Sequence, residues 1–324
     1  MKTILEKNKI FLFTILAAVI TFFSCDNQGS EDQTVPHEGR WGIYELNLAD
    51  DKTQLIYNGS ERISGLRLNH DGNSFVFSKT TGGTTDNFEE IYTMAIDGSN
   101  LQRLTDNDYL DVYPAWSPDG SRIAFLSRRE VDLDIYVMDS DGSNVEKLYD
   151  SGTNDADIHW NGNKICFTRD CQIWIINNDG QNPIQITDPS NACQWGNAVL
   201  PFGDYDPRLS LNGSKIVFER LVDDVSSNGN YDLFVINDDG SEETALTNNG
   251  YTQGLANWSH SGNSIVYIVS AISDAGKYDM YTMNADGTNT QNITPDYYQP
   301  LFLSHSAIFS IDDTKIYFIG EWWE

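Results

Sequence analysis

Residues 113–125 read Tyr-Pro-Ala-Trp-Ser-Pro-Asp-Gly-Ser-Arg-Ile-Ala-Phe, two short apolar strands separated by a Pro-Asp-Gly turn. Proline presets φ for a turn, and aspartate and glycine tolerate the left-handed backbone of a tight hairpin. Ile123 and Phe125 alternate with other residues, which is typical of a half-buried strand. Further copies are centred on Asp71-Gly72, Asn161-Gly162, Asn212-Gly213, Ser261-Gly262 and Asp312-Asp313. The stretch therefore predicts one β-hairpin that occurs six times.

A second unit alternates with this hairpin. It is an apolar and aromatic strand followed by an Asp-Gly turn, as in Ile91–Met94 and Asp97-Gly98. Its other strands are Ile43–Leu46, Ile135–Met138, Ile173–Ile176, Leu233–Ile236 and Met280–Met283. A short fourth strand is expected after each turn, for example at Gln102–Thr105, Ile184–Thr187, Thr244–Thr247 and Gln291–Thr294.

Two hairpins together give four strands in roughly 40–50 residues, the period of propeller blades. The two units are out of step, because the chain opens with the second unit (Gly42–Tyr57) and ends with the first (Ile308–Ile319). These halves complete each other only if the ring closes, which also removes exposed sheet edges. We therefore expect an all-β fold over residues 40–324, a six-bladed β-propeller of four-stranded antiparallel blades. A two-plus-two strand clasp between the N- and C-termini closes it.

One position of the first hairpin is always large and apolar, which predicts a core position between blades. It is occupied by Leu68, Trp116, Trp160, Leu209, Trp258 and Phe309.

The run Trp116–Phe125 resembles the repeats of the TolB-like six-bladed β-propeller family, and the resemblance extends over roughly residues 40–320. Members of that family bind proteins or peptides, form the gating domain of prolyl oligopeptidases or, in one branch, act as oligogalacturonate lyases. The resemblance implies a propeller here without the N-terminal α/β domain of TolB itself.

The N-terminus predicts a lipoprotein signal peptide over residues 1–24. Met1–Lys9 carries three lysines, and Ile10–Phe23 is an uncharged apolar run too short to span a bilayer comfortably. Ser24-Cys25 resembles the lipobox of bacterial lipoproteins, in which the cysteine is acylated. We expect lipid attachment at Cys25, a flexible tether over residues 25–39 and a place in the cell envelope, on the periplasmic or cell-surface side. An ordinary secretory signal with a chance cysteine is the alternative.

The chain is strongly acidic, with 48 Asp and Glu against 20 Lys and Arg and a net charge of −28. Loss of residues 1–24 would leave −30. Such a surface repels phosphate backbones, so nucleic acid is not an expected partner. Cations, basic peptides and neutral glycans are compatible with it.

The long, irregular connections all fall at one end of the predicted ring, between second and third strands and between blades. Binding residues concentrate on loops held by a rigid scaffold, so this end is the candidate binding face. Its aromatic and acidic residues are Tyr109, Asp111, Tyr113, Trp195, Asp204, Tyr205, Asp206, Tyr251, Tyr297 and Tyr298. Aromatic rings beside carboxylates suit a protein, peptide or glycan. Equally, several of these rings could serve only to pin the loops.

Nothing in the sequence forms a convincing catalytic set. There is no Gly-x-Ser-x-Gly motif, and the histidines His70, His159, His260 and His305 fall in four different blades. We therefore assign no catalytic residue, metal or cofactor. The leading hypothesis is a membrane-tethered binding or scaffold protein. The alternative is a carbohydrate-active enzyme, a lyase or glycosidase, with its site on the same face.

Three cysteines remain beside Cys25. Cys171 begins a strand at the long-loop end, and Cys193 lies in the longest loop of that end, which favours a disulfide between them. Cys166 falls inside a strand and is expected to be a small buried residue. Three free thiols are the alternative.

Overall fold

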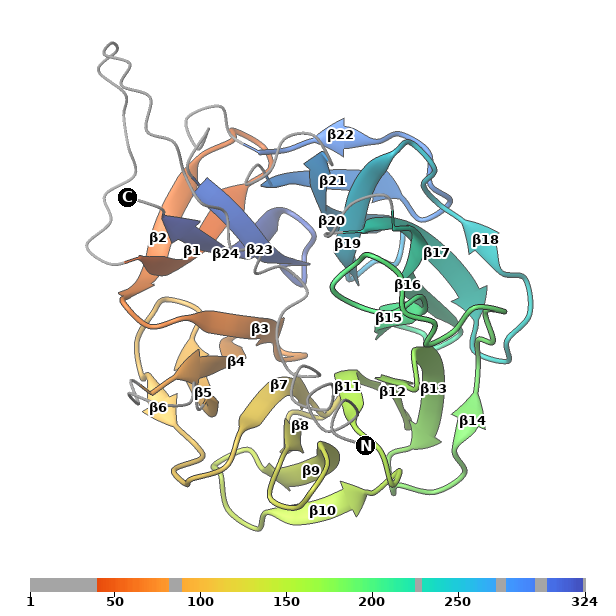
Figure 1. Cartoon of the computed structure of the whole chain (residues 1–324). Coiled ribbons are helices and arrows are strands. Elements are labelled where there is room, and N and C mark those ends of the chain that lie inside the picture. Colours follow the sequence, from red (N-terminus) through yellow and green to blue (C-terminus); the bar gives the residue numbers. More distant parts are fainter. Residues whose placement is uncertain (1–39, 82–88, 225–228, 272–277, 295–301, 323–324) are drawn as a thin grey trace.

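The computed structural model describes residues 40–81, 89–224, 229–271, 278–294 and 302–322. These residues form 24 strands in six four-stranded antiparallel sheets. Figure 1 shows the sheets arranged as blades around a central axis, with the first strand of each blade innermost. The expected six-bladed propeller is confirmed. No helix suited to crossing a membrane occurs among the described residues.

Five of the six blades are each built from four consecutive strands. The first of these blades contains β3 (Ile63–Leu68), β4 (Ser74–Thr80), β5 (Glu89–Ala95) and β6 (Gln102–Arg103). The second contains β7 (Asp111–Trp116), β8 (Arg122–Ser127), β9 (Asp134–Asp139) and β10 (Glu146–Tyr149). The third contains β11 (Asp155–Asn161), β12 (Lys164–Arg169), β13 (Gln172–Asn177) and β14 (Ile184–Gln185). The fourth contains β15 (Asp204–Leu209), β16 (Lys215–Asp223), β17 (Asn230–Asn237) and β18 (Thr244–Ala245). The fifth contains β19 (Tyr251–Trp258), β20 (Ser264–Ala271), β21 (Tyr278–Asn284) and β22 (Gln291–Asn292).

The sixth blade joins the two ends of the described chain. It contains β1 (Trp41–Asn47), β2 (Thr53–Gly59), β23 (Phe302–Phe309) and β24 (Lys315–Trp322), in the order β2-β1-β24-β23. β1 and β24 pair without a break from Trp41 opposite Glu321 to Asn47 opposite Lys315. This is the predicted two-plus-two clasp.

Four of the fourth strands, β6, β14, β18 and β22, have only two residues and are shorter than expected. A threonine just beyond each strand explains the difference. The hydroxyl of Thr105 accepts a hydrogen bond from the backbone N–H of Ile91 at 2.9 Å, and Thr247 does the same for Leu233 at 2.9 Å. A side chain therefore replaces the next backbone acceptor of the ladder, and regular pairing stops.

The core lies mainly between neighbouring blades. Trp160 of β11, for example, packs with Val112 and Ala124 of the preceding blade. The other five members of this repeated position also join clusters of buried apolar residues. The expectation of an inter-blade core at this position is confirmed.

The segment between β14 and β15 is fastened at one end of the ring. Cys171 and Cys193 form a disulfide with a Cα–Cα distance of 5.5 Å, while Cys166 is a free, fully buried thiol. Buried apolar contacts of Ala198 and Tyr205 with Leu221 hold the same segment against β16. We call this the loop end of the propeller, and the opposite end, where the Asp-Gly turns lie, the turn end.

Candidate functional site

Every first strand is interrupted at the same level by an irregularity in its pairing. In five blades the interrupting residue has a left-handed backbone with φ between 50° and 63°. These residues are Gly65, Tyr113, Asp157, Asp206 and Leu255. Glycine adopts this conformation at no steric cost, whereas other residues are strained there. All five residues lie on the innermost strands of their blades, next to the propeller axis (Figure 1).

Three buried carboxylates, those of Asp157, Asp206 and Glu219, lie close enough at this level to influence one another. Burial and the charge of Asp206 raise the pKa of Asp157 to about 7. Burial, followed by the same neighbouring charge, also raises the pKa of Glu219 well above its usual range. The backbone N–H of Leu255 donates to Glu219 Oε2 at 3.0 Å, and Arg208 pairs with Asp206 at 3.0 Å. These interactions fix the carboxylates to the scaffold.

A cavity of about 170 Å³ lies at the turn end of the axis. Every blade contributes its large repeated residue to the walls, so the six inter-blade residues also shape this cavity. Its lining includes Arg67 and Arg208 from β3 and β15 and three histidines, His70, His159 and His260. The sequence placed these histidines in separate blades, but the ring brings them together, and the rings of His70 and His260 lie 5.8 Å apart.

The sequence prediction did not include this cavity. One signal was present: Arg67 and Arg208 are charged residues inside first strands, in the position held by Ala115 and Ile308 in other blades. A charge at an inner strand position points to the axis.

At the loop end, two of the predicted binding carboxylates are instead parts of buried networks. Asp111 is fully buried and accepts hydrogen bonds from Ser127 Oγ at 2.5 Å and Arg129 Nη2 at 3.0 Å. Asp204 is also fully buried, and Arg220 holds both of its oxygens at 2.5 and 2.8 Å. Their charges are used within the blades.

The predicted aromatic residues divide in the same way. Tyr205 is buried, and its hydroxyl donates to the carbonyl oxygen of Pro201 at 2.6 Å, so it pins its own loop. Tyr113 and Asp206 are the left-handed residues beside the axis described above. Burial, reinforced by nearby carboxylates, raises the pKa of Tyr113 above its ordinary value. Tyr297 and Tyr298 lie outside the described residues, as does Cys25.

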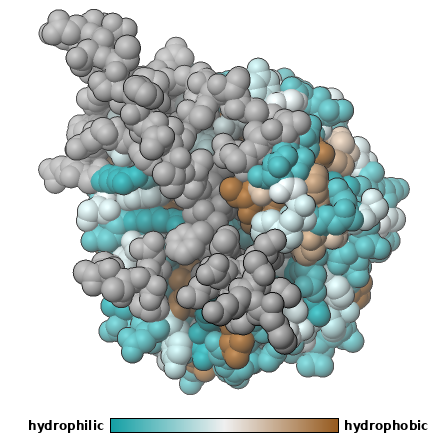
Figure 2. Space-filling model, viewed as in Figure 1, coloured by the Kyte–Doolittle hydropathy of each residue, from teal (hydrophilic) through white to brown (hydrophobic). Residues whose placement is uncertain are grey.

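Three predicted residues of the loop face are well exposed: Tyr109 (44%), Trp195 (53%) and Tyr251 (48%). Trp195 shares its segment with exposed Val199, and the backbone N–H of Asn197 ties that segment to Asp224 at 2.8 Å. Figure 2 shows apolar surface near the segment between β14 and β15. An apolar group is thus presented to solvent on a loop that is fixed by a disulfide.

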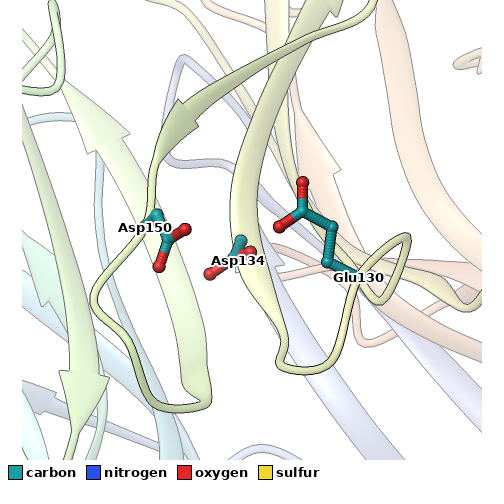
Figure 3. Close-up of side chains that lie close together, drawn as sticks. All are labelled: Glu130, Asp134 and Asp150. Atoms are coloured by element: carbon teal, nitrogen blue, oxygen red, sulfur yellow. The ribbon is translucent and has the colours of Figure 1, made fainter.

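The acidic group Glu130, Asp134 and Asp150 has the spacing of a possible metal site (Figure 3). The ammonium of Lys147 donates to all three carboxylates, at 2.7, 3.2 and 3.0 Å. Hydrogen bonds to Glu130 and Asp150 raise the pKa of Lys147, which favours its charged form. Lys147 therefore supplies the positive charge that this group requires, and the arrangement does not support a metal there.

Comparison with known proteins extends the structural evidence. The model of the TolB beta propeller domain matches residues 35–220. A Protein TolB homolog of Chlorobium luteolum is 26% identical over 152 residues, 45% of this chain and 31% of that protein. Dipeptidyl-peptidase 5 of Porphyromonas gingivalis is 31% identical over 83 residues, 25% of this chain and 12% of the relative. The chain thus spans less than a third of the length of these curated relatives.

Solved structures share the fold at low sequence identity. A putative TolB from Agrobacterium tumefaciens has a TM-score of 0.65 at 16% identity, covering 88% of this chain and 99% of that structure. TolB from Acinetobacter baumannii has a TM-score of 0.60 at 17% identity, covering 80% and 64%. With more than half of its length matched by the domain model and all six blades in place, the chain belongs to the TolB β-propeller domain family.

Proposed function

We propose that this chain is a membrane-tethered protein of the cell envelope that binds a protein or peptide through its loop face. The observation that carries the proposal is the exposed Trp195 on the disulfide-fastened segment between β14 and β15. Rigid aromatic residues are the usual anchors of protein interfaces, because ordering them on binding costs little entropy. The relatives named TolB support an envelope location and a protein partner.

Two carboxylates of the loop end, Asp111 and Asp204, are not available for catalysis. General acid or base chemistry needs a carboxyl group that can reach substrate and exchange protons. Asp111 and Asp204 are instead fully buried and paired with Arg129 and Arg220. Both carboxylates therefore hold their blades together through these ion pairs.

Capture of partners from the native envelope by crosslinking tests the binding face. Replacement Trp195→Ala should reduce recovery of the partner about tenfold or more, since a central aromatic anchor contributes about 2 kcal/mol or more. Ile184→Ala is a matched control, because Ile184 is a similarly exposed apolar residue (56%) on the outer strand β14. Equal loss with both variants, or no loss with Trp195→Ala, would contradict the assignment. Captured material that resists protease would identify a glycan instead.

The anchor is tested separately. Cys25→Ser should prevent labelling by a fatty-acid probe and shift the protein from the membrane to the soluble fraction, because a serine hydroxyl does not replace the acylated thiol. Immunoblotting of fractions from cells that express either form measures the shift. Continued labelling with unchanged fractionation would rule out Cys25 as the lipid site.

A further inference from the structure

The turn-end cavity has an unusual charge for this protein. Acidic residues outnumber lysine and arginine by 48 to 20 in the chain, yet the lining contains two arginines, three histidines and no Asp or Glu. Leu211 and Ile311 at its edge are 42% and 43% exposed, so the cavity opens to solvent at the turn end. A cationic recess in an acidic protein favours a small anion.

Arg67 is the central observation. It is 8% exposed, and its Nη1 donates only to the adjacent carbonyl oxygen of Leu66, at 2.7 Å. Its Nε has no hydrogen-bond partner, and no described carboxylate lies within 4.0 Å of the guanidinium. Asp206 and Asp157 favour its charged form only from a greater distance, without direct pairing. The hydration that the buried charge loses is therefore replaced only in part, which is costly. Burial and the nearby charge of Arg208 accordingly lower the pKa of Arg67 to about 9.

Arg208 and His159 line the same cavity. Arg208 is bound to Asp206 through Nη2, but its Nε is also without a partner. His159 Nδ1 accepts the backbone N–H of Leu209 at 3.1 Å, which leaves Nε2 to carry the proton of the neutral ring. Burial and the two arginines keep the pKa of His159 well below its usual value, so the ring stays neutral.

The aromatic walls complete the site. The buried indole N–H groups of Trp116 and Trp160 have no hydrogen-bond partner, although both residues line the cavity. The Trp258 N–H, by contrast, is satisfied by the carbonyl oxygen of Arg208 at 2.9 Å. The cavity thus combines the guanidinium of Arg67 with flat apolar surface, and none of its lining residues is acidic.

We propose that this cavity is a binding site for the carboxylate group of a small ligand, with Arg67 as its principal partner. A guanidinium forms two parallel hydrogen bonds with a planar carboxylate, and the tryptophans pack against the group that bears it. A volume of about 170 Å³ is below the common range of whole drug-like ligands, so it accommodates one acid-bearing group. The site lies at the end opposite the loop face and does not depend on the function proposed for that face.

Calorimetric titration of the protein with benzoate tests the site, with benzamide as the uncharged match. Benzoate should bind and benzamide should not. Arg67→Met should weaken benzoate binding about tenfold or more, since hydrogen bonds to a charged group contribute about 1.5–3 kcal/mol. The same variant should melt at a higher temperature without ligand, because it removes an unpaired buried charge. A merely structural arginine would give lower stability instead.

Arg122→Gln is the control, because Arg122 also begins a strand at the turn end but pairs with Glu146 outside the cavity, at 2.6 Å. It should leave benzoate binding unchanged. A short peptide with a free C-terminus and its amidated form distinguish a peptide terminus from a free small acid as the natural source. Failure of benzoate to bind at millimolar concentration, equal binding of benzamide, tighter binding of inorganic phosphate, or unchanged affinity in Arg67→Met would each overturn the proposal.

Discussion

Deletion of residues 308–324 is expected to abolish cooperative unfolding of the propeller. The deletion removes β24 and the end of β23, and β1 then loses the partner with which it pairs from Trp41 to Asn47. It also removes Phe318, a fully buried ring that stacks on Tyr44 at 5.4 Å. The two neighbouring blades, β3–β6 and β19–β22, would then each lie beside an incomplete blade with exposed strand edges. Thermal unfolding followed by circular dichroism should lose its single sharp transition.

Removal of residues 25–39, a segment of similar length that precedes β1, is the control and should leave the transition unchanged. A cooperative transition near the native midpoint after the C-terminal deletion would mean that the blades behave as an open array, in which each repeat depends only on its neighbours. The clasp would then contribute little to stability.

The fold could be predicted because its signals are local and repeated. A turn such as Ser-Pro-Asp-Gly at residues 117–120 specifies a hairpin from within a few residues. Five further hairpins with similar turns fix the period of the repeat. The clasp followed from counting half-blades at the two ends. The short fourth strands were missed because their length depends on side-chain acceptors such as Thr105, which periodicity does not reveal.

The site could be predicted only in part, because its interactions join distant positions. Asp204 looks like a loop carboxylate in the sequence, but Arg220, 16 residues later, uses both of its oxygens. Arg67 and Arg208 are brought to one cavity by closure of the ring, and no local pattern links them. Trp195, a predicted residue of the binding face, is exposed, and its role in binding stays a prediction.

A comparison of two blades exposes a further imbalance at the loop end. Asp155 and Asp204 occupy equivalent positions in their blades. On the neighbouring strand, Arg169 lies opposite Asp155 and Arg220 lies opposite Asp204. Arg220 binds Asp204, but Arg169 donates to the hydroxyl of Tyr149 at 3.3 Å and lies over an aromatic ring instead. Asp155 is fully buried, and among the described residues no lysine or arginine lies within 4.0 Å of its carboxylate. A hydrogen bond with Ser151 offsets only part of the cost of burying its charge. Burial, reinforced by the charge of Asp134, raises the pKa of Asp155 to about 8.

Asp155→Asn should therefore stabilise the protein, and the gain should depend on pH. A raised pKa means that the folded state binds the proton more tightly than the unfolded state, whose aspartate pKa is about 3.9. This residue therefore makes the wild-type free energy of unfolding decrease as the pH rises from about 4 to 8. Asparagine mimics the neutral acid, so the variant does not lose stability in this way. Urea unfolding should show a gain on the order of 2 kcal/mol at pH 8 that shrinks towards zero near pH 4.

Asp204→Asn is the matched control and should destabilise the protein by about 1–3 kcal/mol, because it leaves Arg220 without its buried partner. A loss of stability in Asp155→Asn at pH 8 would show that the carboxylate is charged and paired in solution.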